Sequence, residues 1–358
     1  MFSKKKKIKN KIYIILAIIF ISFSKFSTNI LYADTYKIKN VEVIKSYDLN
    51  FNKLNVIESA FTKAYSELIQ KITSSEYIGN LNKAKINDIK NLVDSFSIID
   101  EKFIDNNYHA TFEVDFDKKN VLKYLEKKNI FTSIPIEKEI FILPIMIDTE
   151  KNQVLLLSEN YFYNNWNNNN KKYYLLKYIL PNEDIDDIKF IQSRLNNIEE
   201  YEFDEIVSKY NLNDYIIAIF FKDKKNIKIL SKINFNKNLS ISNEAFSNFE
   251  IESKFQGEQI IEKLKISYEN EWKKINQINT SIKLSLTMLI ESKNLNLIDQ
   301  FEKKLFQSDL VYKYNIDAIS NDNTIYKIMY NSTPDKFLSE FKNNGFEIDT
   351  SGKIWKIK

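Results

Sequence analysis

The chain contains no cysteine and only four glycines, Gly79, Gly257, Gly345 and Gly352. Without cysteine there are no disulfides, thiolate nucleophiles or cysteine zinc sites, so the fold has to be stabilised by side-chain packing alone. Isolated glycines cannot form the loops whose backbone N–H groups hold phosphate, which excludes a P-loop and a dinucleotide-binding fingerprint. The apolar content of 44% over 358 residues is sufficient for the cores of two or three domains.

Residues 1–33 have the layout of a secretory signal peptide. A lysine cluster between Lys4 and Lys11 precedes the apolar run Ile12–Phe23, and the small residue Ala33 precedes Asp34. As a helix, this run spans roughly 18 Å, whereas the hydrocarbon core is roughly 30 Å thick, which favours cleavage after Ala33 and export to the periplasm. The alternative is an uncleaved leader that anchors the protein in the inner membrane through Ile12–Phe23, so that residues 1–33 make its only membrane contact.

The basic charge of the chain belongs to this leader. The whole chain has a net charge of +4, and the seven lysines of residues 1–33 contribute +7, which leaves −3 for the rest. Outside the leader, Arg194 is the single arginine. Such a surface is a poor ligand for a phosphate backbone, so we expect no nucleic-acid partner.

Residues 34–130 are predicted to form a βαββα domain. Tyr36–Ile44 alternates like a strand, and apolar residues spaced three and four apart from Leu54 to Ile72 indicate an amphipathic helix. Ser95–Ile104 is a second predicted strand. Tyr108–Phe116 alternates strictly between apolar and polar residues, which is typical of a half-buried antiparallel strand, and Asp117 can cap a closing helix.

Residues 138–277 are predicted to form a central α/β domain with a layered sheet. Ile140–Ile147 is almost continuously apolar, as in a strand buried on both faces. Tyr215–Phe221 and Ile227–Phe235 are predicted to be adjacent strands joined by a charged turn, and a helix is expected over Gln259–Ile275. The alternation of strands and helices favours a mainly parallel sheet covered on both faces.

Residues 278–358 follow a βαββαβ pattern and predict a ferredoxin-like unit. A strand over Ile282–Ile290 and a helix over Leu295–Phe306 are followed by a hairpin that turns at 321–323. Thr333 can cap the second helix, and a short final hairpin turns at Ser351-Gly352. The expected fold class is therefore α/β of the α+β type, built from several small modules.

The aromatic segment around Trp166 is the first candidate for a binding surface. Phe162 and Trp166 are four residues apart on a possible helix, beside Tyr161, and could line a groove for a peptide, glycan or lipid. The alternative is that these rings belong to the core, which is the more frequent role of such a pair.

Asp184 and Asp187 lie in an acidic segment, residues 182–187, that suggests a divalent-ion site. The segment lacks the glycine and the distal glutamate of an EF-hand loop, and the alternative is a helix start capped by Asn182.

His109 is the only histidine and is interpreted as an ordinary strand residue, so we expect neither a typical zinc site nor another metal or cofactor.

Paired carboxylates are the remaining enzymatic possibility. Five acids cluster between Glu199 and Glu205, and a metal-independent glycan hydrolase needs two carboxylates that face each other across a cleft. The alternative is a solvated acidic face, because sequence neighbours rarely face a cleft in this way. The sequence has no G-x-S-x-G motif, and no glycine stands beside a candidate nucleophilic serine.

The sequence resembles an uncharacterised Gram-negative envelope family, domain of unknown function 2066, over nearly the whole chain after the leader. The resemblance rests on five segments. They are the helix with Ala60 and Ala64, the hairpin that runs from Asp100-Glu101 to the strand Tyr108–Phe116, the segment Phe141-Ile142-Leu143-Pro144, the aromatic segment Asn160–Trp166, and Leu180-Pro181 with Asp184 and Asp187. The family pattern has two tryptophans four apart, whereas here Phe162 stands four residues before Trp166. The resemblance implies an envelope location and the fold, but no activity.

Together these patterns predict an exported, non-enzymatic binding or scaffolding protein of the cell envelope. Its expected partner is an envelope protein, a peptide or a glycan. The candidate binding residues are Tyr161, Phe162, Trp166, Asp184 and Asp187. The carboxylate hydrolase and the membrane-anchored form remain as alternatives.

Overall fold

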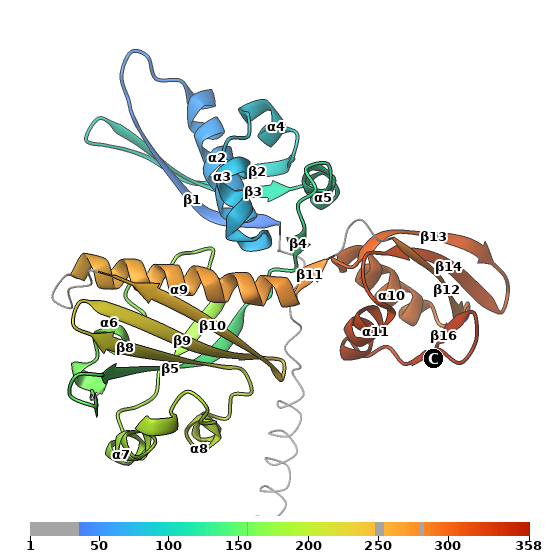
Figure 1. The fold of residues 1–358 in the computed structure, drawn as a ribbon. Coiled ribbons are helices and arrows are strands. Elements are labelled where there is room, and N and C mark those ends of the chain that lie inside the picture. Colours follow the sequence, from blue (N-terminus) through green and yellow to red (C-terminus); the bar gives the residue numbers. More distant parts are fainter. Residues whose placement is uncertain (1–35, 156, 248–253, 279–282) are drawn as a thin grey trace, which may run out of the picture.

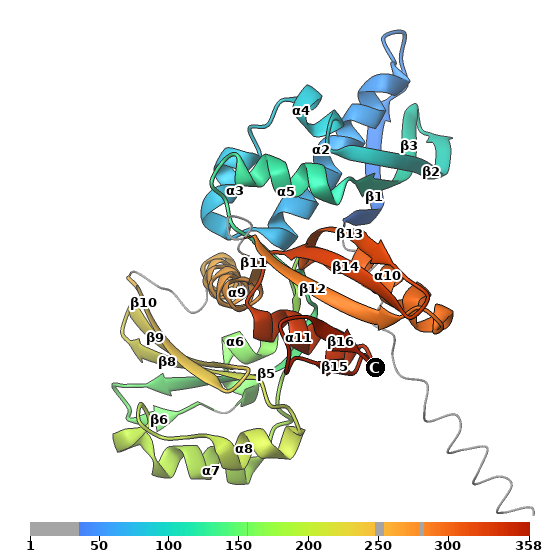
Figure 2. The ribbon, with the colours of Figure 1, turned by 90° about the vertical axis from the view of Figure 1, so that its right-hand side faces the viewer.

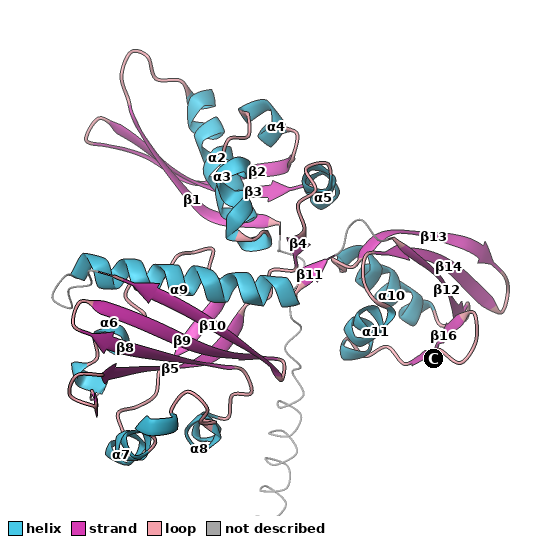
Figure 3. Ribbon diagram, in the orientation of Figure 1, coloured by secondary structure: helices cyan, strands magenta, loops and turns pink. Residues whose placement is uncertain are grey.

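The computed structural model describes residues 36–155, 157–247, 254–278 and 283–358. It shows three domains, each with its own sheet (Figure 1), and helices and strands are mixed in all of them (Figure 3). The α+β class is confirmed. The predicted signal peptide lies outside the described residues. Within those residues, every helix is too short or too polar to cross a membrane.

The first domain is the predicted βαββα unit with two additional short helices. Its elements are β1 (Lys37–Ser46), α2 (Lys53–Ile72), α3 (Ser75–Leu81), α4 (Ile86–Lys90), β2 (Val93–Ile104), β3 (Asn107–Phe116) and α5 (Lys118–Glu126). The sheet order is β1-β3-β2, with both pairs antiparallel. The sequence pattern missed α3 and α4, which are too short to show a helical period.

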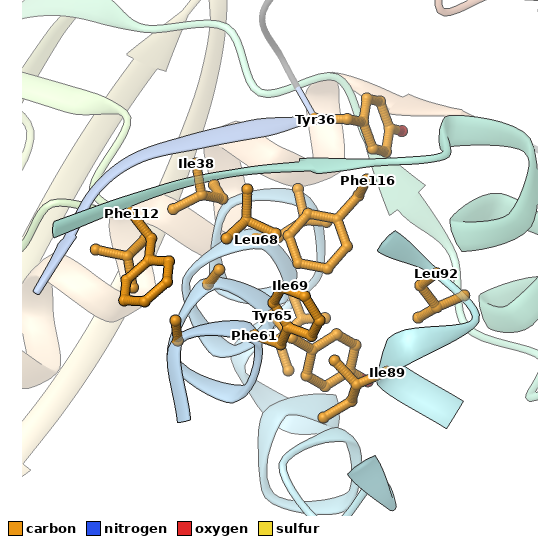
Figure 4. Close-up of a cluster of buried hydrophobic side chains, with 14 of the residues drawn as sticks. Tyr36, Ile38, Phe61, Tyr65, Leu68, Ile69, Ile89, Leu92, Phe112 and Phe116 are labelled. Atoms are coloured by element: carbon orange, nitrogen blue, oxygen red, sulfur yellow. The ribbon is translucent and has the colours of Figure 1, made fainter. Parts of the chain in front are cut away.

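The core of the first domain lies between this sheet and its helices (Figure 4). Every second side chain of β3, from Tyr108 to Phe116, is buried. They meet the apolar stripe of α2, where Leu68, Ile69 and Ile72 are completely buried. His109 lies on β3 between two of the buried residues and is partly exposed, as expected for an ordinary strand residue.

The central domain has a six-stranded sheet of order β10-β9-β8-β5-β6, with β7 also paired to β5. Its elements are β5 (Lys138–Asp148), β6 (Gln153–Val154), α6 (Tyr161–Asn165), β7 (Leu176–Ile179), α7 (Ile185–Ser193), α8 (Asp204–Val207), β8 (Tyr215–Asp223), β9 (Asn226–Phe235), β10 (Asn238–Phe246) and α9 (Lys254–Ile275). As predicted, β5 is buried and β8 and β9 form a hairpin.

This central sheet is mixed, whereas the sequence predicted a mainly parallel one. Only β5–β7 and β5–β8 are parallel, because β9 and β10 continue from β8 as tight hairpins. β10, a largely exposed edge strand rich in serine and asparagine, is not among the strands predicted from the sequence. The prediction of cover on both faces is confirmed: α6 and α9 pack on one face and α7 and α8 on the other (Figure 1).

The third domain has the sheet order β13-β14-β12-β16-β15. Its elements are β12 (Leu284–Glu291), α10 (Leu295–Gln307), β13 (Val311–Ile319), β14 (Asn323–Tyr330), α11 (Pro334–Asn343), β15 (Ile348–Asp349) and β16 (Trp355–Ile357). Thr333 caps α11 as predicted, because its side chain accepts a hydrogen bond from the Lys336 N–H. Ile282, where the first strand was expected to begin, lies outside the described residues.

The ferredoxin-like prediction for this domain is not confirmed. A ferredoxin-like sheet would place the strand that follows α11 directly beside β12 and antiparallel to it. Here the final hairpin inserts β16 at that position, parallel to β12, and displaces β15 to the edge. Ile357 of β16 is buried in the core, and Trp355 of β16 and Ile348 of β15 pack against it.

The three domains meet at a small junction. Its strands are β4 (Thr132–Ser133), which follows α5, and β11 (Gln277–Ile278), which follows α9, and the two form an antiparallel pair. Ile134 and Ile278 bury their side chains there against Leu310 of the third domain. The junction places the third domain beside both others (Figure 2).

Candidate binding site between the first and third domains

Phe162 and Trp166 belong to the core of the central domain. Both have no exposed surface. Phe162 stacks on Phe220 with 3.9 Å between ring centroids, and Trp166 packs against Tyr178 and Tyr268. The interpretation of these two rings as core is confirmed, and neither side chain presents a surface to a ligand.

Tyr161 is only partly buried and lies against helix α9. A Cβ atom built on Gly257 would be 2.1 Å from Cε1 of the Tyr161 ring, so the ring occupies the space that the missing side chain leaves. Gly257 therefore allows α6 to approach α9 closely. The role of Tyr161 that this geometry supports is packing between these helices.

Asp184 and Asp187 form a helix start held by a lysine. The Asp184 carboxylate accepts a hydrogen bond from the Asp186 N–H (2.9 Å) and caps α7. Lys209 Nζ lies 3.2 Å from Asp184 Oδ2 and 2.6 Å from Asp187 Oδ1. The Asp186 N–H and Lys209 lower the pKa of Asp184. The cap interpretation is confirmed, but the capping residue is Asp184 and not Asn182.

A lysine already occupies the place of a cation at this helix start. In the part of the chain that the structure describes, no group of three or more His, Cys, Asp or Glu side chains is arranged to hold a metal ion.

The acids between Glu199 and Glu205 are exposed, in agreement with a solvated face. Among the described carboxyl groups, burial raises the pKa of two, Glu269 in α9 and Asp309 in the third domain. Glu269 accepts hydrogen bonds from the Leu175 and Leu176 N–H groups. These two carboxyls lie in different domains and do not form the facing pair that a glycan hydrolase requires.

A cavity of about 580 Å³ lies between the first and third domains. Its walls come from the start of β1, the end of β3 and the N-terminal half of α5 on one side, and from the end of α10 and the start of β13 on the other. Its main apolar and aromatic side chains are Phe116, Leu122, Leu305, Phe306, Tyr312 and Tyr314. Four lysines and four aspartates also line it, so its charges balance.

Asp309 is the most buried charged residue of this cavity. Its side chain is 4% exposed, and its Oδ1 lies 2.8 Å from Nζ of Lys118 in the first domain. Lys118 Nζ also donates a hydrogen bond to the Ser308 carbonyl (2.6 Å). Asp309 Oδ2 has no hydrogen-bond partner among the described residues. The pair therefore joins the two domains while one carboxylate oxygen stays unsatisfied.

The electrostatics around Asp309 follow from its burial. Burial raises the pKa of its carboxyl, and the charge of Lys118 opposes this effect only in part. The neighbouring Tyr36 has its own pKa raised by burial and by the Asp309 charge. On the other side, Ser308 Oγ donates to Glu340 Oε2 (3.1 Å), and Glu340 pairs with Lys304 (2.7 Å). These contacts hold the Asp309 segment within the third domain, and Lys118 joins that segment to the first domain.

A smaller cavity of about 250 Å³ lies beside α9 in the central domain. Its most buried lysine, Lys265, is 1% exposed and donates a hydrogen bond to Asn170 Oδ1 (2.9 Å). Burial lowers the pKa of Lys265 to about 8. Because the amine already has an acceptor inside the protein, this cavity is a weaker candidate than the larger one between domains.

The cavity between the first and third domains was not predicted from the sequence. Lys118 and Asp309 are far apart in the chain, and neither belongs to a local motif. The one feature of the sequence that marked this part of the cavity was the position of Lys118, directly after the Asp117 cap and the end of the alternating strand. Phe306 and Tyr312 looked like ordinary helix and strand residues.

No family model matches the sequence, and a search of curated proteins found no match. The resemblance to the Gram-negative envelope family therefore depends on the quoted residues alone.

Proposed function

We propose that the protein is exported to the cell envelope and acts there as a non-enzymatic binding or scaffolding protein. The first and third domains hold the partner, an envelope protein, a peptide or a glycan, between them. The observation that carries this proposal is the cavity of about 580 Å³ at their boundary. Ligand sites commonly have about this volume and occur preferentially between domains.

The lining of the cavity fits binding better than catalysis. Exposed aromatic rings such as Phe306 (80% exposed) and Tyr312 (41% exposed) offer area for contact with a partner. The balanced lysines and aspartates suit a ligand that carries both donors and acceptors, such as a peptide backbone or a sugar. The two described carboxyls whose pKa burial raises, Glu269 and Asp309, lie in different domains, which does not favour the glycan-hydrolase alternative.

The leader supports the envelope location. In the proposed arrangement the chain is processed near Ala33 and is soluble in the periplasm, and membrane contact is limited to residues 1–33 if the leader is retained. Cell fractionation with N-terminal sequencing tests this part. An unprocessed chain found in the cytosol, free of membrane, contradicts the proposal.

Binding at the cavity is tested by crosslinking and pull-down of the mature chain, from Asp34 onward, in its native envelope. The double variant Phe306→Ala/Tyr312→Ala should lose the partner captured by the unchanged protein. Leu295→Ala is the matched control, because Leu295 is 73% exposed on the same helix but lies at its other end. Equal capture by all three proteins contradicts the assignment of the cavity.

A further inference from the structure

In the described part of the chain, β1 is an edge strand of the first domain. On one side β1 pairs with β3, and no strand in the described part of the chain pairs with its other side. Directly after β1, the Tyr47 N–H donates a hydrogen bond to the Asn106 carbonyl (2.8 Å), so the backbone groups of Tyr47 face the β3 side. Because antiparallel pairing alternates, the N–H and C=O groups of Ile44 and Ser46 point away from β3.

A contact from α2 supports this assignment. Lys63 Nζ donates a hydrogen bond to the Glu42 carbonyl (2.8 Å), two residues before Ile44, from the side of the helix. Nearer the start of β1, Lys172 Nζ donates a hydrogen bond to the Asn40 carbonyl (3.1 Å). The N-terminal part of the edge is therefore already occupied by lysines. The backbone groups of Ile44 and Ser46 form the open part.

A groove of about 620 Å³ runs beside this open part. One wall is the strand, with Val43, Ile44 and Lys45, and the other wall is the polar face of α2, from Asn55 to Lys63. Figure 1 shows α2 lying along β1. A strand edge with a helix beside it is a geometry in which an extended peptide adds to a sheet, because the edge supplies hydrogen bonds and the walls hold alternate side chains.

The groove also indicates the chemistry of the peptide. Ile44 is 56% exposed and offers an apolar contact. Lys45 and Lys63 line the groove, whereas its acid, Glu58, is paired with Lys90 at 2.6 Å. The local charge is positive and favours acidic side chains.

We infer that a partner protein contributes an extended acidic segment that joins the first domain as a fourth strand at the β1 edge. The segment pairs with the backbone of Ile44 and Ser46 and lies in the groove beside α2. This site is separate from the cavity between domains, so the inference does not depend on the proposed function. Two sites on one chain are what a scaffold needs to bring two partners together.

The test uses a short end-blocked peptide of alternating valine and glutamate as the probe. Two further versions carry N-methyl groups on all valine amides or on all glutamate amides. Alternate amides face the same strand edge, so one version loses the donors that pair with β1 and the other keeps them. We expect the unmethylated peptide and only one methylated version to bind, as measured by calorimetry. Equal binding of both methylated versions, or no binding of any peptide at millimolar concentration, overturns the inference.

A substitution at Ile44 tests the protein side. Ile44→Pro removes the outward N–H and should weaken peptide binding by about ten-fold or more, while a proline is tolerated at an edge whose N–H is not used by the sheet. Ile44→Ala keeps the N–H and loses only the apolar contact of the side chain, so it should weaken binding less than Ile44→Pro. Thermal unfolding followed by circular dichroism establishes that both variants are folded. Unchanged binding by folded Ile44→Pro contradicts the inference.

The edge could instead pair with a second copy of the chain. Sedimentation of the full chain distinguishes this outcome: a dimer that Ile44→Pro abolishes would assign the edge to self-association and overturn the peptide assignment. A monomer at the concentrations used for calorimetry supports the peptide.

Discussion

Lys118 of the first domain and Asp309 of the third form an ion pair with 2.8 Å between Nζ and Oδ1, and the Asp309 side chain is almost completely buried. Both residues line the cavity that we assign to ligand binding. It also makes the contact between these domains depend on a charge that is only partly compensated.

Replacing Lys118 with methionine should lower the free energy of unfolding by about 2 kcal/mol, because the Asp309 carboxylate loses its compensating charge. The partial exposure of Lys118 keeps this loss below that of a fully buried ion pair. Adding Asp309→Asn should recover most of this loss, because the remaining group is neutral. Urea unfolding at neutral pH measures both variants. Additive losses in the double variant would show that the two residues do not interact.

Asp309 should also make stability depend on pH. Its pKa is raised in the folded protein, so its ionised form disfavours folding. This cost is absent below the ordinary aspartate value of about 3.9 and develops as the pH rises through the raised pKa. The stability of Asp309→Asn relative to the unchanged protein should therefore increase from acidic to neutral pH. Urea unfolding across this range measures it, and a constant or decreasing difference contradicts the account.

Gly257→Ala should destabilise the protein by about 1–3 kcal/mol although alanine favours helices, because the new methyl group would meet the Tyr161 ring. In a Tyr161→Ala background the space is free, and the same change should be neutral or stabilising by up to about 1 kcal/mol. Thermal unfolding of the four proteins gives the comparison. An equal effect of Gly257→Ala in both backgrounds would mean that the ring moves away without cost.

Asp184→Ala should cost about 1 kcal/mol, the usual effect of removing a helix cap, together with a small loss from the Lys209 contact. Asn182→Ala is the matched control. The Asn182 backbone N–H bonds to the Tyr210 hydroxyl, and this bond does not involve the side chain that is removed. Urea unfolding should therefore separate the two variants. Equal losses would restore the prediction that Asn182 is the cap.

Elements whose pattern is local and long were predictable from the sequence. The alternation from Tyr108 to Phe116 identified a strand with one buried face, because side chains alternate on a strand whatever its neighbours are. The apolar run Ile140–Ile147 likewise identified a strand covered on both sides. The cap at α7 was placed two residues early, because Asn182 and Asp184 are chemically equivalent as caps.

Features that depend on contacts between distant segments were not predictable. β16 pairs with β12 and contributes Trp355 and Ile357 to the core, but no local pattern distinguishes that outcome from a ferredoxin-like sheet. The cavity is formed by side chains from two domains, and each of them fits an ordinary role within its own helix or strand. Phe162 and Trp166 attracted attention as aromatic residues, but the same hydrophobicity placed them in the core.

The central claim is that a partner binds between the first and third domains. A photo-crosslinking amino acid in place of Phe306, at the cavity, should form a specific adduct in the native envelope, and the same amino acid in place of Leu295, at the far end of α10, should not. Adducts that are identical at both positions, or absent at position 306 from a correctly exported protein, would contradict the account.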